Sequence, residues 1–178
     1  MGHKHTREQI LDGAVDAAIG DGLSQLTFGR LAKRLAISDR VVVYYFPTKD
    51  DLITEVLLLV GARLQEVLGG AFTGPADDHI ALAKAAWPVL ARPEIDPLFA
   101  LFFEAIGLAA AGREPYASLA TQLLAGWAAW LAGFFAGTPG HRRAEAEATM
   151  AVIDGLLLLR QLSGAAAANR AAARLGIR

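Results

Sequence analysis

The stretch FGRLAKRLAISDRVVVYYFP, residues Phe28 to Pro47, has the pattern of two short helices that cross at a steep angle over a tight turn. Only Ala36 and Ile37 separate the two helices, and Ala32 is small where they approach most closely. The apolar side chains that fall where the helices face each other are Leu31, Leu35, Ile37, Val42 and Tyr45. The stretch therefore predicts a helix-turn-helix, which is either a buried structural pair or a DNA-reading element.

The outward face of the second helix favours DNA reading. Six residues remain on that face: Ser38, Asp39, Arg40, Val41, Val43 and Tyr44. A helix with such a mixed surface can enter the major groove, where an arginine reads guanine and valines touch thymine methyl groups. We therefore expect Arg40, Ser38, Val41 and Val43 to face bases.

Cationic residues are concentrated around the same stretch. Between Thr27 and Lys49 the chain has a net charge of +4, against −1 for the whole chain. The cations are Arg30, Lys33, Arg34, Arg40 and Lys49, and the one carboxylate is Asp39. A basic patch on an otherwise acidic chain predicts phosphate binding, although solvated surface charge would give the same count.

Thr48 and Lys49 begin the next predicted helix, which runs to about Leu68. A cation in the first turn opposes the helix dipole at a cost of roughly a few tenths of a kcal/mol. A helix start with free N–H groups and a lysine can hold a phosphate, so both residues are candidate DNA backbone anchors. The alternative is a solvated surface lysine.

The remaining periodicity predicts an all-α protein. Thr6 and Gln9 form a capping-box pattern before a first helix that ends at Gly20 to Gly22, and Thr27 and Ser38 are suited to cap the two short helices. Further helices are predicted at roughly 76 to 91, 94 to 111, 115 to 136, 141 to 163 and 166 to 175. Cysteine is absent and the start of the chain lacks the apolar segment of a signal peptide, so we expect a cytoplasmic protein.

Three segments together carry a family resemblance: TREQIL at 6–11, LTFGRLAKRLAIS at 26–38 and YYFPTKDDL at 44–52. Over about residues 6 to 55 they resemble the amino-terminal domain of TetR-family transcriptional regulators. AVIDGLLLLRQL, at 151–162, is similar to the last long helix of that family. The resemblance implies a homodimer that binds a palindromic operator, usually as a repressor released by a small molecule.

Carried onto this chain, the resemblance places Thr27 and Arg30 near phosphates and makes Ser38 to Tyr44 the recognition helix. It also makes Tyr44 and Lys49 phosphate contacts. The chain departs from the family pattern at Val43, where tyrosine is usual, so base specificity cannot be transferred. It also has Ala36 where glycine is usual, which costs roughly 1 kcal/mol if that residue is left-handed.

The carboxy-terminal helices are apolar enough to require a partner. Pro115 to Gly140 contains no charge or histidine, yet its polar residues and many small ones argue against a membrane span, and its large side chains cover two helix faces. The run Leu156 to Leu159 covers every side of a helix. We expect a homodimer, with interface candidates Leu124, Trp130, Leu131, Phe135, Leu156 and Leu159.

A small-molecule pocket, if present, has an apolar or aromatic character. Its candidate residues are Trp87, Phe99, Phe102, Phe103 and Trp127, for which ordinary core packing is the alternative, and the scarce polar candidates are Glu104, His79 and Arg63. No catalytic motif or metal-ligand spacing is present, so we expect no enzyme, no metal and no cofactor.

The sequence thus predicts a helix-turn-helix DNA-binding domain over residues 1–47 and a ligand-sensing and dimerisation helical domain over 48–178. The expected partners are double-stranded DNA carrying an inverted repeat, a second copy of the chain and an unknown small-molecule effector, with no membrane. The expected function is a ligand-responsive repressor. The alternative is a helical small-molecule-binding protein whose helix-turn-helix is vestigial.

Overall fold

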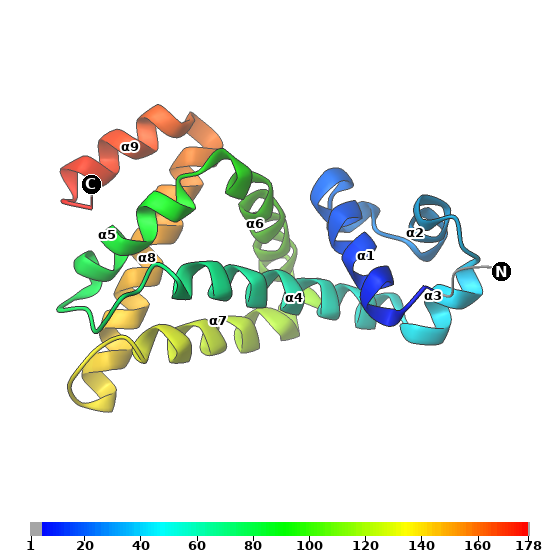
Figure 1. Ribbon diagram of the computed structural model, residues 1–178, viewed down its shortest axis with the longest axis horizontal. Helices are drawn as coiled ribbons and strands as arrows, with labels where there is room; N and C mark the ends of the chain where they lie inside the picture. Colours follow the sequence, from blue (N-terminus) through cyan, green and yellow to red (C-terminus); the bar gives the residue numbers. More distant parts are fainter. Residues whose placement is uncertain (1–4, 178) are drawn as a thin grey trace. The chain divides into compact units, whose positions relative to one another are not determined.

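The computed structural model describes residues 5–177, and its regular elements are helices. The α-helices are α1 (Arg7–Asp21), α2 (Phe28–Leu35), α3 (Asp39–Tyr45), α4 (Lys49–Gly69), α5 (His79–Leu90), α6 (Asp96–Ala110), α7 (Tyr116–Ala132), α8 (Pro139–Ser163) and α9 (Ala165–Arg174) (Figure 1). Two 3₁₀ turns, η1 (Leu23–Gln25) and η2 (Pro93–Ile95), join some of them. The described residues form no β-strand, only an isolated bridge between Ala76 and Phe135, so the predicted all-α class is confirmed.

The chain divides into two compact units. The N-terminal unit ends at Arg63 and also includes Ala100–Ala120. The C-terminal unit comprises Leu64–Phe99 and the residues from Thr121 onward. Helices α4, α6 and α7 each contribute residues to both units.

Local capping signals determine where the first helices begin. Thr6 and Gln9 form the predicted capping box of α1, and the Thr27 hydroxyl accepts a hydrogen bond from the Arg30 N–H at the start of α2. Ser38 lies at the N-cap of α3, but its side chain makes no capping hydrogen bond. The expectation that both hydroxyl residues cap their helices is therefore correct for Thr27 and wrong for Ser38.

Close packing holds α1, α2 and α3 together in the N-terminal unit. Helix α2 packs against α1 and α3, and Leu31 of α2 and Val42 of α3 are fully buried. Gly13 of α1 is also buried, and a Cβ there would lie 2.6 Å from the Leu35 side chain of α2. Ala36 takes the left-handed conformation, with φ of 54°, that allows α3 to turn away from α2.

The C-terminal unit is built around α8, which packs against α5 and α9. Buried Arg160 of α8 donates two hydrogen bonds to the Asp96 carboxylate, and Trp87 of α5 donates one to the Asn169 side chain of α9. A buried cluster lies nearby, formed by Leu82, Leu131, Phe135 and Ala146. Within residues 5–177, none of the helices combines the length and the apolar character needed to span a bilayer.

Candidate nucleic-acid interface

Helix α3 presents a mixed polar and apolar face to solvent. Val42 is fully buried, whereas the neighbouring Val43 is 43% exposed and Tyr44 is 79% exposed. Ser38, Asp39 and Arg40 are also exposed, and Val41 is half-buried. The residues predicted to face DNA from α3 therefore lie together on one accessible surface, with Val42 anchoring the helix from behind.

The two tyrosines at the end of α3 have different roles. The Tyr45 hydroxyl donates a hydrogen bond, at 3.5 Å, to the backbone carbonyl of His5. Tyr44 projects outward and packs edge-to-face on Tyr45, with 4.9 Å between ring centroids. Tyr45 thus belongs to the packing of the unit, and the Tyr44 hydroxyl extends toward solvent, where it can reach a phosphate.

The start of α4 is a second part of the predicted interface. The Thr48 hydroxyl accepts a hydrogen bond from the Asp51 N–H and donates one to the Asp51 carboxylate, which also accepts from the Thr48 N–H. These bonds use the Thr48 side chain for capping, so the groups at this helix start that remain suited to an anion are the exposed Lys49 and the N–H groups of the first turn.

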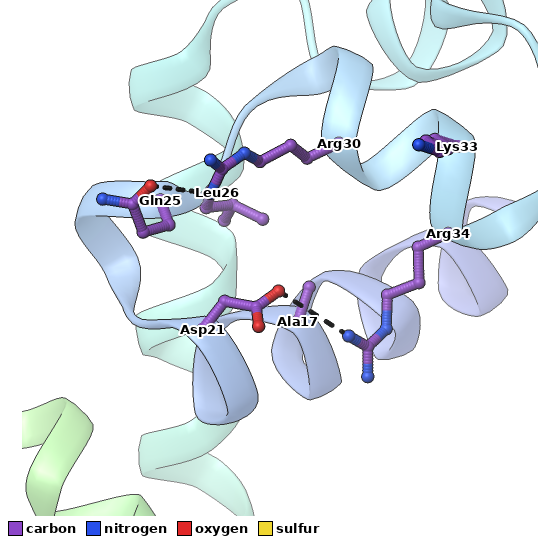
Figure 2. A pocket seen from close by; sticks show the side chains of 7 residues that line it. All are labelled: Ala17, Asp21, Gln25, Leu26, Arg30, Lys33 and Arg34. Atoms are coloured by element: carbon purple, nitrogen blue, oxygen red, sulfur yellow. Dashed lines mark hydrogen bonds and ion pairs between the residues drawn. The ribbon is translucent and has the colours of Figure 1, made fainter.

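Thr27 and Arg30 mark a third part, at the start of α2. Both residues are exposed, and the Arg30 guanidinium donates a hydrogen bond to the Gln25 side-chain oxygen at 2.6 Å. Gln25 is neutral, so this bond orients Arg30 without cancelling its charge. Arg30 also borders a surface groove between α1, η1 and α2 that contains Lys33 and Arg34, two further cations of the predicted basic patch (Figure 2).

Glu104 of α6 binds the turn between α1 and α2, a contact between residues about 80 positions apart that no local sequence pattern predicts. Its carboxylate accepts hydrogen bonds from the backbone N–H groups of Leu23 and Ser24, each at 2.9 Å, and from the Ser24 hydroxyl at 2.6 Å. Burial raises the pKa of Glu104, but the hydrogen bonds from Ser24 and Leu23 outweigh it, so the pKa lies below its usual value. Gly22 precedes the turn with φ of +90°, and a Cβ there would lie 3.1 Å from the Glu104 carboxylate.

The residues predicted to bind a ligand lie in both units. Trp87, Phe99 and Trp127 belong to the C-terminal unit, and Phe102 and Phe103 to the N-terminal unit, where their ring centroids are 5.6 Å apart. Trp87 and Phe99 are buried, while Trp127 is half-buried and packs edge-to-face on Trp130.

The polar ligand candidates all have partners within their own unit. Glu104 binds the η1 turn, and Arg63 forms an ion pair with Asp12. His79 donates its backbone N–H to Glu145 and contacts the same carboxylate oxygen through its ring at 2.9 Å, which lowers the pKa of Glu145. Within residues 5–177, no cluster of three or more histidine or acidic side chains is arranged to hold a metal ion.

The candidate dimer residues differ in how much surface a single chain leaves accessible. Leu131, Phe135 and Leu156 are buried within the C-terminal unit, Trp130 and Leu159 are half-buried, and Leu124 is exposed. Two further leucines on α8, Leu158 and Leu162, are 43% and 77% exposed. The leucine run in the sequence indicated that α8 needs a partner on several sides, but it did not identify which leucines face outward.

Part of the chain matches a known protein family. Residues 10–56 match the family model described as bacterial regulatory proteins, tetR family. No curated protein sequence matches the chain significantly.

Solved structures resemble nearly the whole chain. A transcriptional regulator from Rhodococcus sp. Rha1 is 22% identical, with a TM-score of 0.71 over 97% of this chain and 95% of that one. A TetR transcriptional regulator from Legionella pneumophila is 20% identical, with a TM-score of 0.65 over 99% and 97%. The multidrug binding protein EbrR, complexed with imidazole, is 24% identical, with a TM-score of 0.69 over 98% and 93%. At these identities the likeness establishes a shared fold.

Proposed function

We propose that this chain, whose residues 10–56 belong to the tetR family of bacterial regulatory proteins, represses transcription as a homodimer on an inverted-repeat operator and is released by a small apolar or aromatic ligand. In this proposal, the domain that contains residues 10–56 binds the DNA. Repression, the operator symmetry and the effector are the parts that experiments must test.

The outward face of α3 is the observation that carries this proposal. A seven-residue helix that buries Val42 yet exposes Val43 and Tyr44 leaves apolar and aromatic surface without a role in its own core. In a major groove, Val43 and Val41 would contact thymine methyl groups, and Arg40 could form a bidentate contact to guanine. The same face therefore suits base reading better than solvation.

Phosphate contacts would hold α3 in register on the duplex. Thr27 and Arg30 lie at or near the start of α2, Thr48 caps the start of α4, and Lys49 and Tyr44 extend from exposed positions. Helix starts present backbone N–H groups to anions, and lysine adds a point charge. Such contacts position the protein but carry no base information.

A dimer would use an exposed face of α8. Ala151, Gly155, Leu158 and Leu162 are all exposed, and their spacing of four, three and four residues places them on one side of the helix; we call them the α8 stripe. Small residues allow close approach of a second helix, and the two leucines supply apolar area. A twofold axis through this stripe would give the symmetry that an inverted repeat requires.

The proposed effector would be apolar or aromatic. The ligand candidates are aromatic side chains, and the polar candidates Glu104, His79 and Arg63 already have intramolecular partners, so few polar contacts would remain for a ligand. EbrR, a structurally similar multidrug binding protein, was solved in complex with imidazole, an aromatic molecule, which supports testing small aromatic compounds first. Such a ligand would release DNA only by binding the non-DNA-binding arrangement better.

Selection of bound sequences from random double-stranded DNA tests the function directly. The purified chain, freed of any copurified ligand, would be equilibrated with the pool at near-physiological salt, with Arg40→Ala as the matched control. We expect wild-type protein to enrich one inverted repeat and the variant to lose preference at one base position in each half-site. Absence of enrichment by a folded wild-type dimer would favour a small-molecule-binding protein with a vestigial helix-turn-helix.

A further inference from the structure

A basic groove lies on the N-terminal unit between α1 and α2, the helix that packs against α3. It has a volume of about 550 Å³ and is lined by Ala17 and Asp21 of α1, by Gln25 and Leu26, and by Arg30, Lys33 and Arg34 of α2. Figure 2 shows these side chains arranged around the hollow, with Arg30 directed toward Gln25 and Arg34 toward Asp21. We call it the α1–α2 groove.

The charges of this groove are only weakly compensated. Three cations face one carboxylate, so the lining carries a net charge of +2. The Arg34 to Asp21 distance is 3.8 Å and both side chains are about half exposed, which makes this a weak surface pair. Arg30 bonds the neutral Gln25, and Lys33 is exposed.

The floor of the groove gives it depth. Ala17 and Leu26 are buried, so the cationic side chains stand around an apolar base. An anion held there would meet the N–H donors of Arg30, Lys33 and Arg34, and the lining side chains that can accept hydrogen bonds are those of Asp21 and Gln25.

We propose that the α1–α2 groove binds phosphates of the DNA that flanks each operator half-site, which extends the footprint of the protein beyond the bases read by α3. This proposal rests on the proposed function. It assigns a role to Lys33 and Arg34, which lie neither on α3 nor at the start of α2 or α4.

The spacing of the cations favours a nucleic-acid backbone over a single small anion. Arg30, Lys33 and Arg34 follow one another along about one turn of α2, which covers roughly 6 Å of helix axis. One DNA strand carries a phosphate about every 3.4 Å along its axis, so a row of cations of this length can neutralise two successive phosphates. Thr27 and Arg30 continue this row to the start of α2.

Removing the charge of Asp21 tests the proposal, because the affinity for DNA should then increase. Its carboxylate would repel phosphates and holds Arg34 toward α1. The variant Asp21→Asn keeps the size of the side chain and removes the charge. We expect it to bind DNA about two- to fivefold more tightly than wild type at low salt, the range that a surface ion pair covers.

The cation variants test the footprint. Lys33→Ala and Arg34→Ala would be compared with wild type on two duplexes: the selected inverted repeat alone, and the same repeat extended by about one helical turn, roughly 10 base pairs, at each end. We expect the extension to strengthen wild-type binding and to have less effect on either variant. On the extended duplex, each lost contact should reduce the slope of log affinity against log salt by about 0.9 per protomer, or about 1.8 per dimer.

Lys84→Ala is the matched control, because Lys84 is an exposed cation on α5 of the C-terminal unit. It should behave as wild type on both duplexes. Thermal melting would verify that all variants fold, which is expected since Asp21, Lys33 and Arg34 are exposed.

Three outcomes would overturn the groove assignment. The first is that both cation variants bind the extended duplex with the affinity and salt slope of wild type, while Arg40→Ala still loses specificity. This outcome would leave the proposed function intact. Another is a shift in melting temperature with inorganic phosphate that the variants lose while they bind DNA normally, which would mark a small-anion site. The third is failure of wild-type protein to prefer any sequence, which would remove the proposed function itself.

Discussion

Ala36 has a backbone conformation that is unfavourable for a residue with a Cβ atom. Its φ of 54° lies in the left-handed region, where a Cβ costs roughly 1 kcal/mol relative to glycine. We expect Ala36→Gly to raise the free energy of unfolding by about 0.5 kcal/mol, since glycine also gives the unfolded chain more freedom. Urea denaturation measures this. The control Ala125→Gly, at an exposed position within α7, should instead lower stability by about 1 kcal/mol; the same sign for both would contradict the strain at Ala36.

Asp154 is a second residue in conflict with its surroundings. It lies on α8, and burial raises the pKa of its carboxyl group to about 6. Above the pKa of the unfolded chain, the folded state retains a proton that the unfolded state has lost, so stability falls as pH rises from about 4 through about 6.

The variant Asp154→Asn should therefore be more stable than wild type at pH 7, by on the order of 2 to 3 kcal/mol, and similar to it near pH 4. Urea denaturation at a series of pH values would follow the difference. A difference that is the same at pH 4 and pH 7 would mean that the charge of Asp154 is not responsible.

At the scale of elements, α3 and the start of α4 should contribute to DNA binding in different ways. Arg40→Ala should relax the preference at one base position by about 1 to 3 kcal/mol, because it removes a base contact. Lys49→Ala should weaken binding to all sequences similarly and reduce the salt slope by about one per protomer, because it removes a phosphate contact. Fluorescence anisotropy with matched and mismatched duplexes distinguishes them, and equal behaviour of the two variants would contradict both roles.

The contact between Glu104 and η1 should stabilise the turn that leads into α2. Glu104→Ala leaves the Leu23 and Ser24 N–H groups without their partner, and we expect it to lower the free energy of unfolding by about 1 to 3 kcal/mol at pH 7. The pKa of Glu104 is lowered, so its contribution is present above the unfolded pKa and is lost as pH falls through the folded value. Wild type and variant should therefore converge in acid. A constant difference across pH would indicate lost packing alone.

Elements determined by local signals were predictable from the sequence. Helices α1 to α4 follow the apolar spacing and the caps at Thr6, Thr27 and Thr48. Helix α7 ends at Ala132 and not near residue 136, because Gly133 turns its N–H to the Trp130 carbonyl and leaves the helical path. Glu104 reaches residues about 80 positions away, a contact that no local pattern records, and the cations of the α1–α2 groove become a site only when α1 and α2 pack.

At the scale of the whole molecule, the proposed regulator depends on two recognition helices acting together. One half-site binds weakly, whereas joining two binding modules raises the overall affinity by about 10² to 10⁴ without any new contact. The α8 stripe is the face that we expect to join them, because Leu158 and Leu162 are exposed in the single chain while Leu156 and Leu157 already fill its core. A charge placed on the stripe would have to be desolvated in the dimer without a partner.

Leu158→Asp and Leu162→Asp should therefore give folded monomers that bind the operator at least about 100-fold more weakly, with α3 unchanged. Sedimentation analysis gives the oligomeric state, circular dichroism the fold, and anisotropy the affinity. Leu58→Asp, at a position on α4 that is 47% exposed, introduces the same charge outside the stripe and should leave the dimer intact. Leu156→Asp, within the core, should unfold the chain instead. If both stripe variants remain dimers with wild-type operator affinity, the subunits associate through another face, and the twofold axis that we place on α8 would have to move there.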